Sequence, residues 1–341
     1  MDRALAQEQV TQGRVTEQFE QEFAAALGVP YAVATTSGSM ALLMGMIALG
    51  IEAGDEVIVP NQTFIATAHA ARMLGARVVL VDTLPDRPVI DPERVAAALT
   101  PRTKLIVPVH LGGRAAPMEA LIGLARQHGL AVLEDAAQAL FSRRGGAVLG
   151  TDGDLGIYSL GITKFITTGQ GGMVVTRSRE LNDRLRLVRN HGVEDVLNER
   201  FDRFGFNFKF TDFQAAMGRV QLGRVPQHQA SVEAVYREYS AAFSELRFLR
   251  PIPIATEAGE LPLWVEVLCA DRQRLIDHLA GHGIQARRYH PNLDRSPHLG
   301  PQGEFSASRV FGREGMMLPS GPGQSIDDVR RVIACLHQFS P

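Results

Sequence analysis

The chain has 341 residues, of which 45% are hydrophobic and 21% charged, and its formal net charge is −2. This length and composition are typical of a globular protein with about two domains. A nearly neutral chain lacks the positive surface that binds nucleic acid or an anionic membrane, so we expect neither partner. No apolar run is long enough to span a membrane.

The two cysteines and the N-terminal segment indicate the compartment. Cys269 and Cys335 lie in apolar runs without metal-binding spacing, so we expect buried free thiols. The segment MDRALAQEQVTQGRV has no apolar signal core. A cytoplasmic protein is therefore expected.

Apolar strands and amphipathic helices alternate along the first two-thirds of the chain. Thr16 is expected to cap a first helix that Gly28 ends. The strands are continuous apolar runs, which is typical of a parallel sheet covered by helices on both faces. Ligands of such sheets bind at the carboxyl ends of the strands. We expect strands at 31–35, 56–60, 76–82, 104–110 and 130–135, with helices at 39–49 and 64–74.

The pattern changes after about Val225. A long helix is expected at 227–243, a strand at 263–269, and further helices at 272–283 and 327–339. The sequence therefore predicts an α/β protein with a large domain (1–225), built on a mainly parallel central sheet, and a smaller C-terminal α+β domain (226–341).

The sequence gives little support for a dinucleotide site, a P-loop or a zinc site. No G-x-G-x-x-G follows the first strand and no phosphate-binding G-x-x-x-x-G-K-[ST] is present. His278 and His282 have the i, i+4 spacing of zinc ligands on a helix, but no glutamate neighbours His278. Gly281 and Gly283 indicate a helix end, so we interpret the histidines as a solvated helix face and expect no metal.

Three other segments each suit one part of a phosphorylated pyridine. TTSGSMALL places Gly38 and Ser39 at a helix N-terminus, which can bind a phosphate or be an ordinary strand–helix turn. Glu134 and Asp135 end a buried strand, where a carboxylate can be structural, cap a helix, or pair with a protonated heterocyclic nitrogen. Lys164 lies among Ile162, Thr163, Phe165 and Ile166, where desolvation would lower its pKa and make it a better nucleophile. Together these features predict a site for pyridoxal 5′-phosphate.

The same segments resemble the DegT/DnrJ/EryC1/StrS family of sugar aminotransferases, within the fold-type I enzymes that depend on pyridoxal phosphate. The similarity runs from about Gly13 to the C-terminus. It is carried by SGSMAL, DEVIVPNQTFIATAHA, VPVHLGG, VLEDAAQA, YSLGITKFITTGQGG, RNHG, GFNFKFTDFQAAMGRVQL and MLPSGPGQS.

The resemblance implies a role for each matching residue. Lys164 matches the lysine that binds the cofactor covalently, Asp135 the partner of the pyridine nitrogen, and Gln138 a side chain near the 3-oxygen. Gly38, Ser39 and Ser159 match phosphate-binding positions, Phe64 the aromatic stacked on the ring, and Asn207 a residue that reaches the phosphate of a neighbouring subunit. The last role implies a homodimer with composite active sites. Phe64 as a core residue and Asn207 as a turn residue remain alternatives.

Several positions depart from the family pattern. The extra N-terminal stretch of the family is missing before Met1. Gln170, Gly112-Gly113, Pro117, Leu140, Phe141 and Asp294 stand where glutamate, a tyrosine, aspartate, histidine, glycine and histidine are common. None of them removes a cofactor anchor, so they bear on the choice of substrate.

The resemblance implies a pyridoxal phosphate-dependent aminotransferase that moves an amino group from a donor, expected to be glutamate, to a keto sugar, expected to be nucleotide-linked. One alternative is a sugar dehydratase of the same family, but those members replace the cofactor-binding lysine with histidine, and Lys164 argues against it. Another is a non-catalytic regulatory protein on the same fold, which the intact set of Lys164, Asp135 and Ser159 disfavours.

Overall fold

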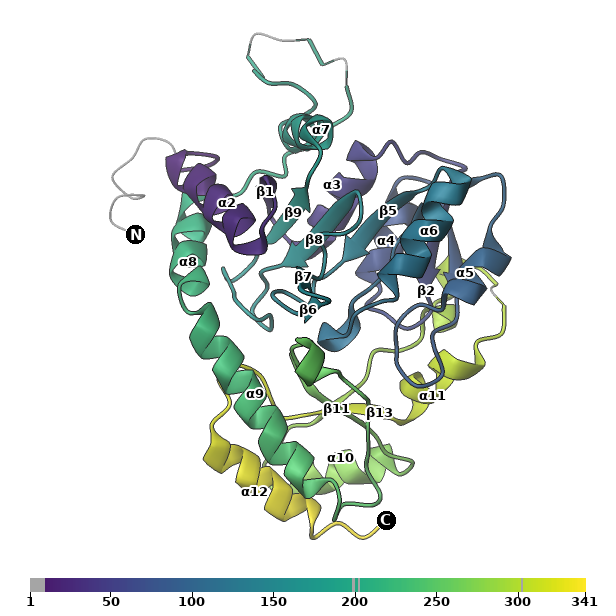
Figure 1. Cartoon of the computed structure of the whole chain (residues 1–341), viewed down its shortest axis with the longest axis vertical. Coiled ribbons are helices and arrows are strands. Elements are labelled where there is room, and N and C mark those ends of the chain that lie inside the picture. Colours follow the sequence, from purple (N-terminus) through teal and green to yellow (C-terminus); the bar gives the residue numbers. More distant parts are fainter. Residues whose placement is uncertain (1–9, 198–199, 202, 302) are drawn as a thin grey trace.

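The computed structural model describes residues 10–197, 200–201, 203–301 and 303–341. A large α/β domain and a smaller domain lie one above the other, and the long helix α9 (Val225–Ala242) extends from the first along the second (Figure 1). The position of the domain boundary, 225/226, stays a prediction. Within the described residues, no helix combines the length and the apolar character needed to cross a bilayer.

The large domain contains a seven-stranded sheet flanked by helices. Its strands, in spatial order, are β1 (Tyr31–Thr35), β9 (Gly172–Thr176), β8 (Leu155–Ser159), β5 (Ala131–Asp135), β4 (Thr103–Ile106), β2 (Glu56–Pro60) and β3 (Arg77–Val81). Its helices are α2 (Arg14–Leu27), α3 (Gly38–Ala48), α4 (Ala66–Met73), α5 (Pro92–Ala98), α6 (Met118–His128), α7 (Arg179–Arg189) and α8 (Asp212–Leu222), with a short 3-10 turn η1 (Leu111–Gly113) and a hairpin of β6 (Arg143–Arg144) and β7 (Ala147–Val148).

The apolar strands are buried on both faces, as their composition predicts. On β2, Val57 and Val59 belong to the core cluster that includes Met44 of α3, whereas Ile58 belongs to the opposite cluster with Leu121 of α6. Each such side chain contributes about 1.5–3 kcal/mol by leaving water.

In the seven-stranded sheet, every strand except β9 runs in the same direction. β9 is antiparallel to both neighbours because the segment between β8 and β9 turns the chain back beside β8. The carboxyl ends of β1, β2, β5 and β8 therefore meet at one edge of the sheet, and the turn that carries Lys164 lies at that edge. The mainly parallel sheet is confirmed.

The cap of α2 differs from the prediction. The helix begins after Gly13 and ends at Gly28, which has the expected left-handed conformation (φ 72°), but Thr16 lies inside the first turn. The carboxylate of Asp212 instead accepts the backbone N–H groups of Gly13, Val15 and Thr16, and the Thr16 hydroxyl at 2.6 Å. A residue remote in sequence thus does what a local cap would do.

The smaller domain is an antiparallel sheet covered by helices. The sheet order is β10 (Arg250–Pro251), β11 (Val265–Leu268), β13 (Gly315–Leu318) and β12 (Arg287–Arg288). The remaining elements are α10 (Arg272–Gly281), α11 (Ser306–Glu314), α12 (Ile326–Leu336) and the 3-10 turns η2 (Thr256–Ala258), η3 (Leu293–Arg295) and η4 (Pro297–Leu299).

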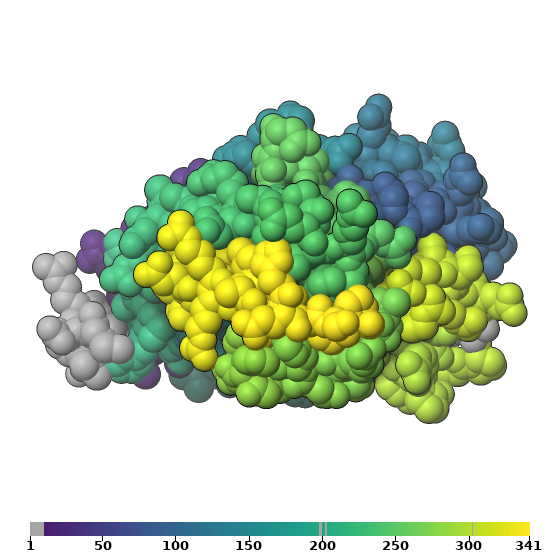
Figure 2. Space-filling view, turned by 90° about the horizontal axis from the view of Figure 1, so that it is seen from below, coloured from purple at the N-terminus to yellow at the C-terminus, as the bar shows by residue number. Residues whose placement is uncertain are grey.

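Helix α12 closes the lower face of the molecule. In the view from below it lies across the surface, packed against α9 and α10 (Figure 2). Cys269 and Cys335 are both buried and free, as expected, in the core cluster between these helices and the small sheet. Helix α9 starts at Val225 rather than 227, because Pro226 is compatible with the first turn of a helix.

Candidate active site

A cavity of about 920 Å³ lies between the two domains. Phe64, Gln138 and Lys164 line it from the large domain, near the edge where the parallel strands end, and Trp264 and His290 line it from the C-terminal part. The arrangement places a lysine and several polar groups in one hollow, as a ligand site requires.

Lys164 is desolvated in this cavity. Its ammonium nitrogen lies 5.6 Å from the centre of the Trp264 ring, and burial lowers the pKa of Lys164, with the charge of Asp135 acting in the opposite direction. The predicted surroundings were partly wrong. Ile162 is 75% exposed and Thr163 is also exposed, so of the four sequence neighbours only Phe165 and Ile166 are buried.

Asp135 presents a buried carboxylate that forms no ion pair with the described residues. It is 5% exposed and accepts hydrogen bonds from the Thr67 hydroxyl at 2.8 Å and the Ala137 N–H at 3.1 Å. Burial raises the pKa of Asp135, opposed by the Thr67 hydrogen bond. No basic side chain in the described part of the chain lies within ion-pair distance of it. A buried carboxylate of this kind suits a cationic ligand group.

The neighbouring carboxylate, Glu134, is occupied by the protein itself. It accepts from the His110 Nε2–H at 2.8 Å and from the N–H groups of Gly150, Asp152 and Gly153. These donors, His110 first, outweigh the effect of burial and lower the pKa of Glu134. The sequence leaves open which of the two acids binds a ligand. In the structure, Glu134 is held by hydrogen bonds within the protein, whereas Asp135 is available to pair with a ligand.

A phosphate-sized anion would find free donors at the start of α3. The Ser37 hydroxyl accepts the Met40 N–H at 3.2 Å, but within the described residues the N–H groups of Gly38 and Ser39 donate to no protein group. An added Cβ at Gly38 would lie 2.8 Å from Cβ of Ser159. Glycine is thus needed to bring this turn against Ser159.

Phe64 and Gln138 lie on the wall next to His290. Phe64 precedes α4 and is 53% exposed, so the core alternative is wrong, and its ring meets His290 edge-on at 5.7 Å. Gln138 accepts the Gly112 N–H at 3.0 Å and its amide nitrogen lies 3.4 Å from His290 Nε2. Burial, and then the charge of Lys164, lower the pKa of His290 to about 4.

Asn207 does not line this cavity. It is exposed and lies in the segment between α7 and α8, where it forms an isolated β-bridge with Asn190. Among the described residues, its side-chain oxygen accepts the Lys209 N–H at 3.3 Å. Phe201, Phe204 and Phe206 of the same segment are about 60% exposed. Within the described residues, the hydrogen bond and the β-bridge of Asn207 are to Lys209 and Asn190 and to none of the other candidate residues.

Three residues of the site escape sequence reasoning. Thr67 lies one residue into α4, and its hydroxyl would have been noticed only with Asp135 beside it. Trp264 is the only tryptophan in the chain, in a segment predicted as a strand, and His290 follows β12. The last two come from the C-terminal part, so only the tertiary structure brings them to Lys164.

Two departures from the family pattern have structural reasons. Gly112 and Gly113 have φ of 62° and 91°. A Cβ on Gly112 would lie 2.5 Å from an Arg114 guanidinium nitrogen and one on Gly113 1.8 Å from the Leu261 carbonyl oxygen, so neither position accepts a tyrosine with this backbone. Asp294 accepts the Asn61 amide at 3.0 Å, and its N–H donates back to that side chain at 2.8 Å. Asp294 therefore joins η3 to the end of β2.

Comparison with known proteins shows similarity along nearly the whole chain. Residues 1–337 match the model of the DegT/DnrJ/EryC1/StrS aminotransferase family. The chain is 37% identical over 335 residues to the GDP-perosamine synthase of Caulobacter vibrioides, covering 96% of this chain and 90% of that protein. The crystal structure of Streptomyces venezuelae DesV in complex with a ketimine intermediate is 34% identical, with a TM-score of 0.94 and coverage of 99% and 92%. DesI in the presence of its TDP-sugar product is 31% identical, with a TM-score of 0.92 and coverage of 99% and 88%.

Proposed function

Since the chain belongs to the DegT/DnrJ/EryC1/StrS aminotransferase family, we propose that it transfers an amino group to a keto sugar with pyridoxal 5′-phosphate as its cofactor. The family depends on this cofactor. The observation that carries the proposal is the pairing of Lys164, which lines the cavity and is desolvated, with Asp135, a buried carboxylate whose charge acts on that lysine. The two groups suit the two reactive ends of a pyridoxal ring.

The residues present fit the cofactor at each part. The free N–H groups of Gly38 and Ser39, with the Ser159 hydroxyl, would hold its phosphate. Asp135 would hold the proton of its ring nitrogen. Phe64 would stack on the ring, and Gln138 would lie near its 3-oxygen. When bound, the cofactor supplies an electron sink for the carbanion that amino transfer requires.

Lys164 would move the proton. Once its amine is free, a lowered pKa leaves more of it unprotonated at neutral pH, so it can remove the proton from the α-carbon of the amino donor. Near the Trp264 ring, water is partly excluded and the resulting ammonium is stabilised over the ring face. The same amine returns a proton in the second half of the reaction.

The substrate class follows from the relatives and suits the cavity. The names of two relatives specify GDP- and dTDP-linked sugars, and DesI was solved with a TDP-sugar. The cavity here holds about 920 Å³, and Arg287, Arg288 and Arg331 line it and would attract a diphosphate. We propose a nucleotide-linked keto sugar as acceptor and glutamate as donor.

A screen of amino transfer tests the proposal. Glutamate is the donor, and UDP-, dTDP- and GDP-linked keto sugars and one free keto-cyclitol are the acceptors. We expect turnover with one nucleotide-linked keto sugar. Turnover with the cyclitol alone would contradict the nucleotide-linked substrate, and elimination of water without amino transfer would favour the dehydratase alternative that Lys164 disfavours. A protein that binds no cofactor would support the non-catalytic alternative.

We also propose a homodimer whose sites share residues. Asn207 lies outside its own cavity, and the exposed Phe201, Phe204 and Phe206 around it would be covered by a second copy. Mixing the inactive variants Lys164→Ala and Asn207→Asp tests this arrangement. If Asn207 serves the neighbour, some mixed dimers carry one site with neither defect, and activity returns. No recovery despite proven subunit exchange would contradict shared sites.

A further inference from the structure

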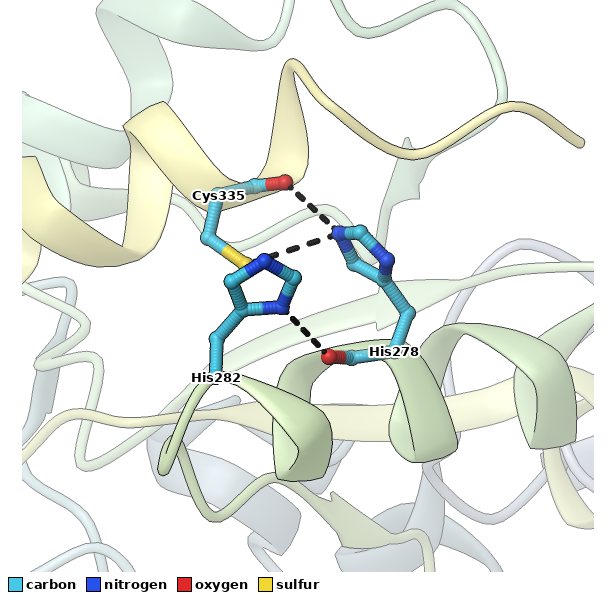
Figure 3. Close-up of side chains that lie close together, drawn as sticks. All are labelled: His278, His282 and Cys335. Carbon is cyan, nitrogen blue, oxygen red and sulfur yellow. Dashed lines mark hydrogen bonds between the residues drawn. The ribbon is translucent and has the colours of Figure 1, made fainter.

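Three metal-ligating side chains meet in the smaller domain, outside the site described above. His278 and His282 lie one turn apart at the end of α10, and Cys335 faces them from the last turn of α12 (Figure 3). Their ligating atoms all lie within 4.8 Å of one another, and His278 Nε2 is 3.5 Å from Cys335 Sγ. Neighbouring N and S ligands of tetrahedral zinc are separated by roughly 3.3–3.6 Å, so small side-chain rotations would complete the geometry.

We propose that His278, His282 and Cys335 bind one zinc ion. This replaces the interpretation of the two histidines as a solvated helix face: His282 is exposed, but His278 is half-buried and turned toward Cys335. The sequence supplies only the i, i+4 pair. The third ligand comes from a helix 57 residues away.

The imidazole of His282 is already oriented for a metal. Its Nδ1–H donates to the His278 carbonyl at 2.9 Å, which leaves Nε2 with a free lone pair. The Arg331 guanidinium donates to the His282 carbonyl at 3.1 Å and so holds the backbone of this residue. Such hydrogen bonds from the second ring nitrogen are the usual support of a metal-binding histidine.

The other two ligands would each change protonation at the ligating atom: the proton of His278 moves from Nε2 to Nδ1, and the Cys335 thiol releases its proton to solvent. His278 Nε2 donates to the Cys335 carbonyl at 3.0 Å, and that oxygen keeps the Gln338 N–H as a donor at 3.1 Å when the imidazole turns to zinc. Burial raises the pKa of the Cys335 thiol, with Arg331 opposing this effect, so the thiolate forms as zinc displaces the proton.

The donor set selects the metal. Two imidazoles and one thiolate suit Zn²⁺, whereas Mg²⁺ and Ca²⁺ take oxygen ligands, and the described cluster contains no carboxylate. Three protein ligands leave a fourth position, and because His282 is exposed, that position opens to solvent and would take water.

Zinc bound here would join two elements that border the active-site cavity. Gly283 and Ile284 follow α10 directly, and Arg331 and Val332 lie one turn before Cys335 on α12, and all four line the cavity. The ion would therefore fix one cavity wall rather than take part in the reaction.

Zinc binding to the untagged full-length protein, loaded with its cofactor, tests the proposal. We expect one zinc per chain after dialysis, and X-ray absorption with one sulfur at about 2.3 Å and nitrogen ligands at about 2.0–2.1 Å. Cys335→Ser and His278→Gln should each weaken zinc binding by at least about 100-fold, since even the loss of a supporting hydrogen bond costs 10- to 100-fold. Zinc should raise the Tm of the wild type but not of these variants.

Cys269→Ser is the matched control, because it removes the other buried thiol and leaves the cluster intact. It should bind zinc as the wild type does. Unchanged circular dichroism shows that each variant is folded. Wild-type protein without stoichiometric zinc, or a zinc–sulfur distance that persists in Cys335→Ser, would overturn the proposal.

Discussion

Replacing Thr67 with valine tests whether the Thr67 hydroxyl keeps Asp135 ionised, as pairing with a protonated ring nitrogen requires. The Thr67 hydroxyl donates to Asp135 at 2.8 Å, and because it donates there, it accepts from Thr63 at 3.3 Å. Valine keeps the shape and removes the donor. The pKa of Asp135, already raised by burial, should then rise further because the Thr67 hydrogen bond lowers it.

The expected loss follows from the strength of that hydrogen bond. A bond to a charged acceptor contributes about 1.5–3 kcal/mol, and about 1.4 kcal/mol is a factor of ten. The Ala137 N–H still holds the other carboxylate oxygen, so Asp135 itself should stay in place. Thr67→Val should weaken binding of pyridoxal 5′-phosphate by about 10- to 100-fold and lower turnover.

The single tryptophan provides the assay. Trp264 lies 5.6 Å from the Lys164 nitrogen, so its fluorescence reports cofactor titrated into the apoprotein. Thr67→Ser keeps the hydroxyl and should bind the cofactor within about threefold of the wild type. Equal weakening in both variants would trace the effect to packing, and wild-type affinity in Thr67→Val would refute the reasoning.

Three further predictions concern pH, the phosphate turn and the dimer. His290 has a pKa of about 4 when folded against 6.5 unfolded, so between these values the unfolded state binds more protons. The free energy of unfolding of the apoprotein should therefore decrease by about 3 kcal/mol as the pH is lowered from 6.5 to 4. Denaturation of His290→Gln should lack this decrease, and the same pH dependence in both proteins would contradict the reasoning. Gly38→Ala should push the start of α3 away from Ser159 and weaken cofactor binding at least tenfold. Gly123→Ala is the control, because its methyl group meets open space, and it should bind the cofactor as the wild type does. Equal affinities of the two variants would show that the turn tolerates a methyl group. The double variant Phe204→Asp/Phe206→Asp should be a monomer in analytical ultracentrifugation. The control Met73→Asp, at a similarly exposed position of α4, should remain a dimer. A dimer in both variants would show that the interface lies elsewhere.

The sequence predicts those parts of the fold that depend on local composition. The apolar runs at 31–35 and 56–60 become β1 and β2 without change, because burial on both faces demands such residues. The reversed direction of β9 and the cap of α2 could not be predicted. The first depends on the turn after β8, and the second on Asp212, which lies far along the chain from Gly13.

Some residues of the candidate site can likewise be predicted from the sequence, and others cannot. Asp135 ends β5 and Lys164 lies in the turn after β8, both in recognisable segments, so the sequence alone proposes them. Thr67, Trp264 and His290 acquire their positions only through tertiary contacts. The prediction that Lys164 is desolvated relied on its sequence neighbours, which is partly wrong, since Ile162 is exposed to solvent.

Borohydride reduction of the cofactor-loaded protein, followed by peptide mass spectrometry, tests the central claim most directly. The chain has only three lysines, Lys104, Lys164 and Lys209, so the assignment is unambiguous. The account predicts one pyridoxyl group per chain, on Lys164, retained in Lys104→Arg and Lys209→Arg and absent from a folded Lys164→Ala. A label on Lys104 or Lys209 in the wild type, or no label at all, would contradict it.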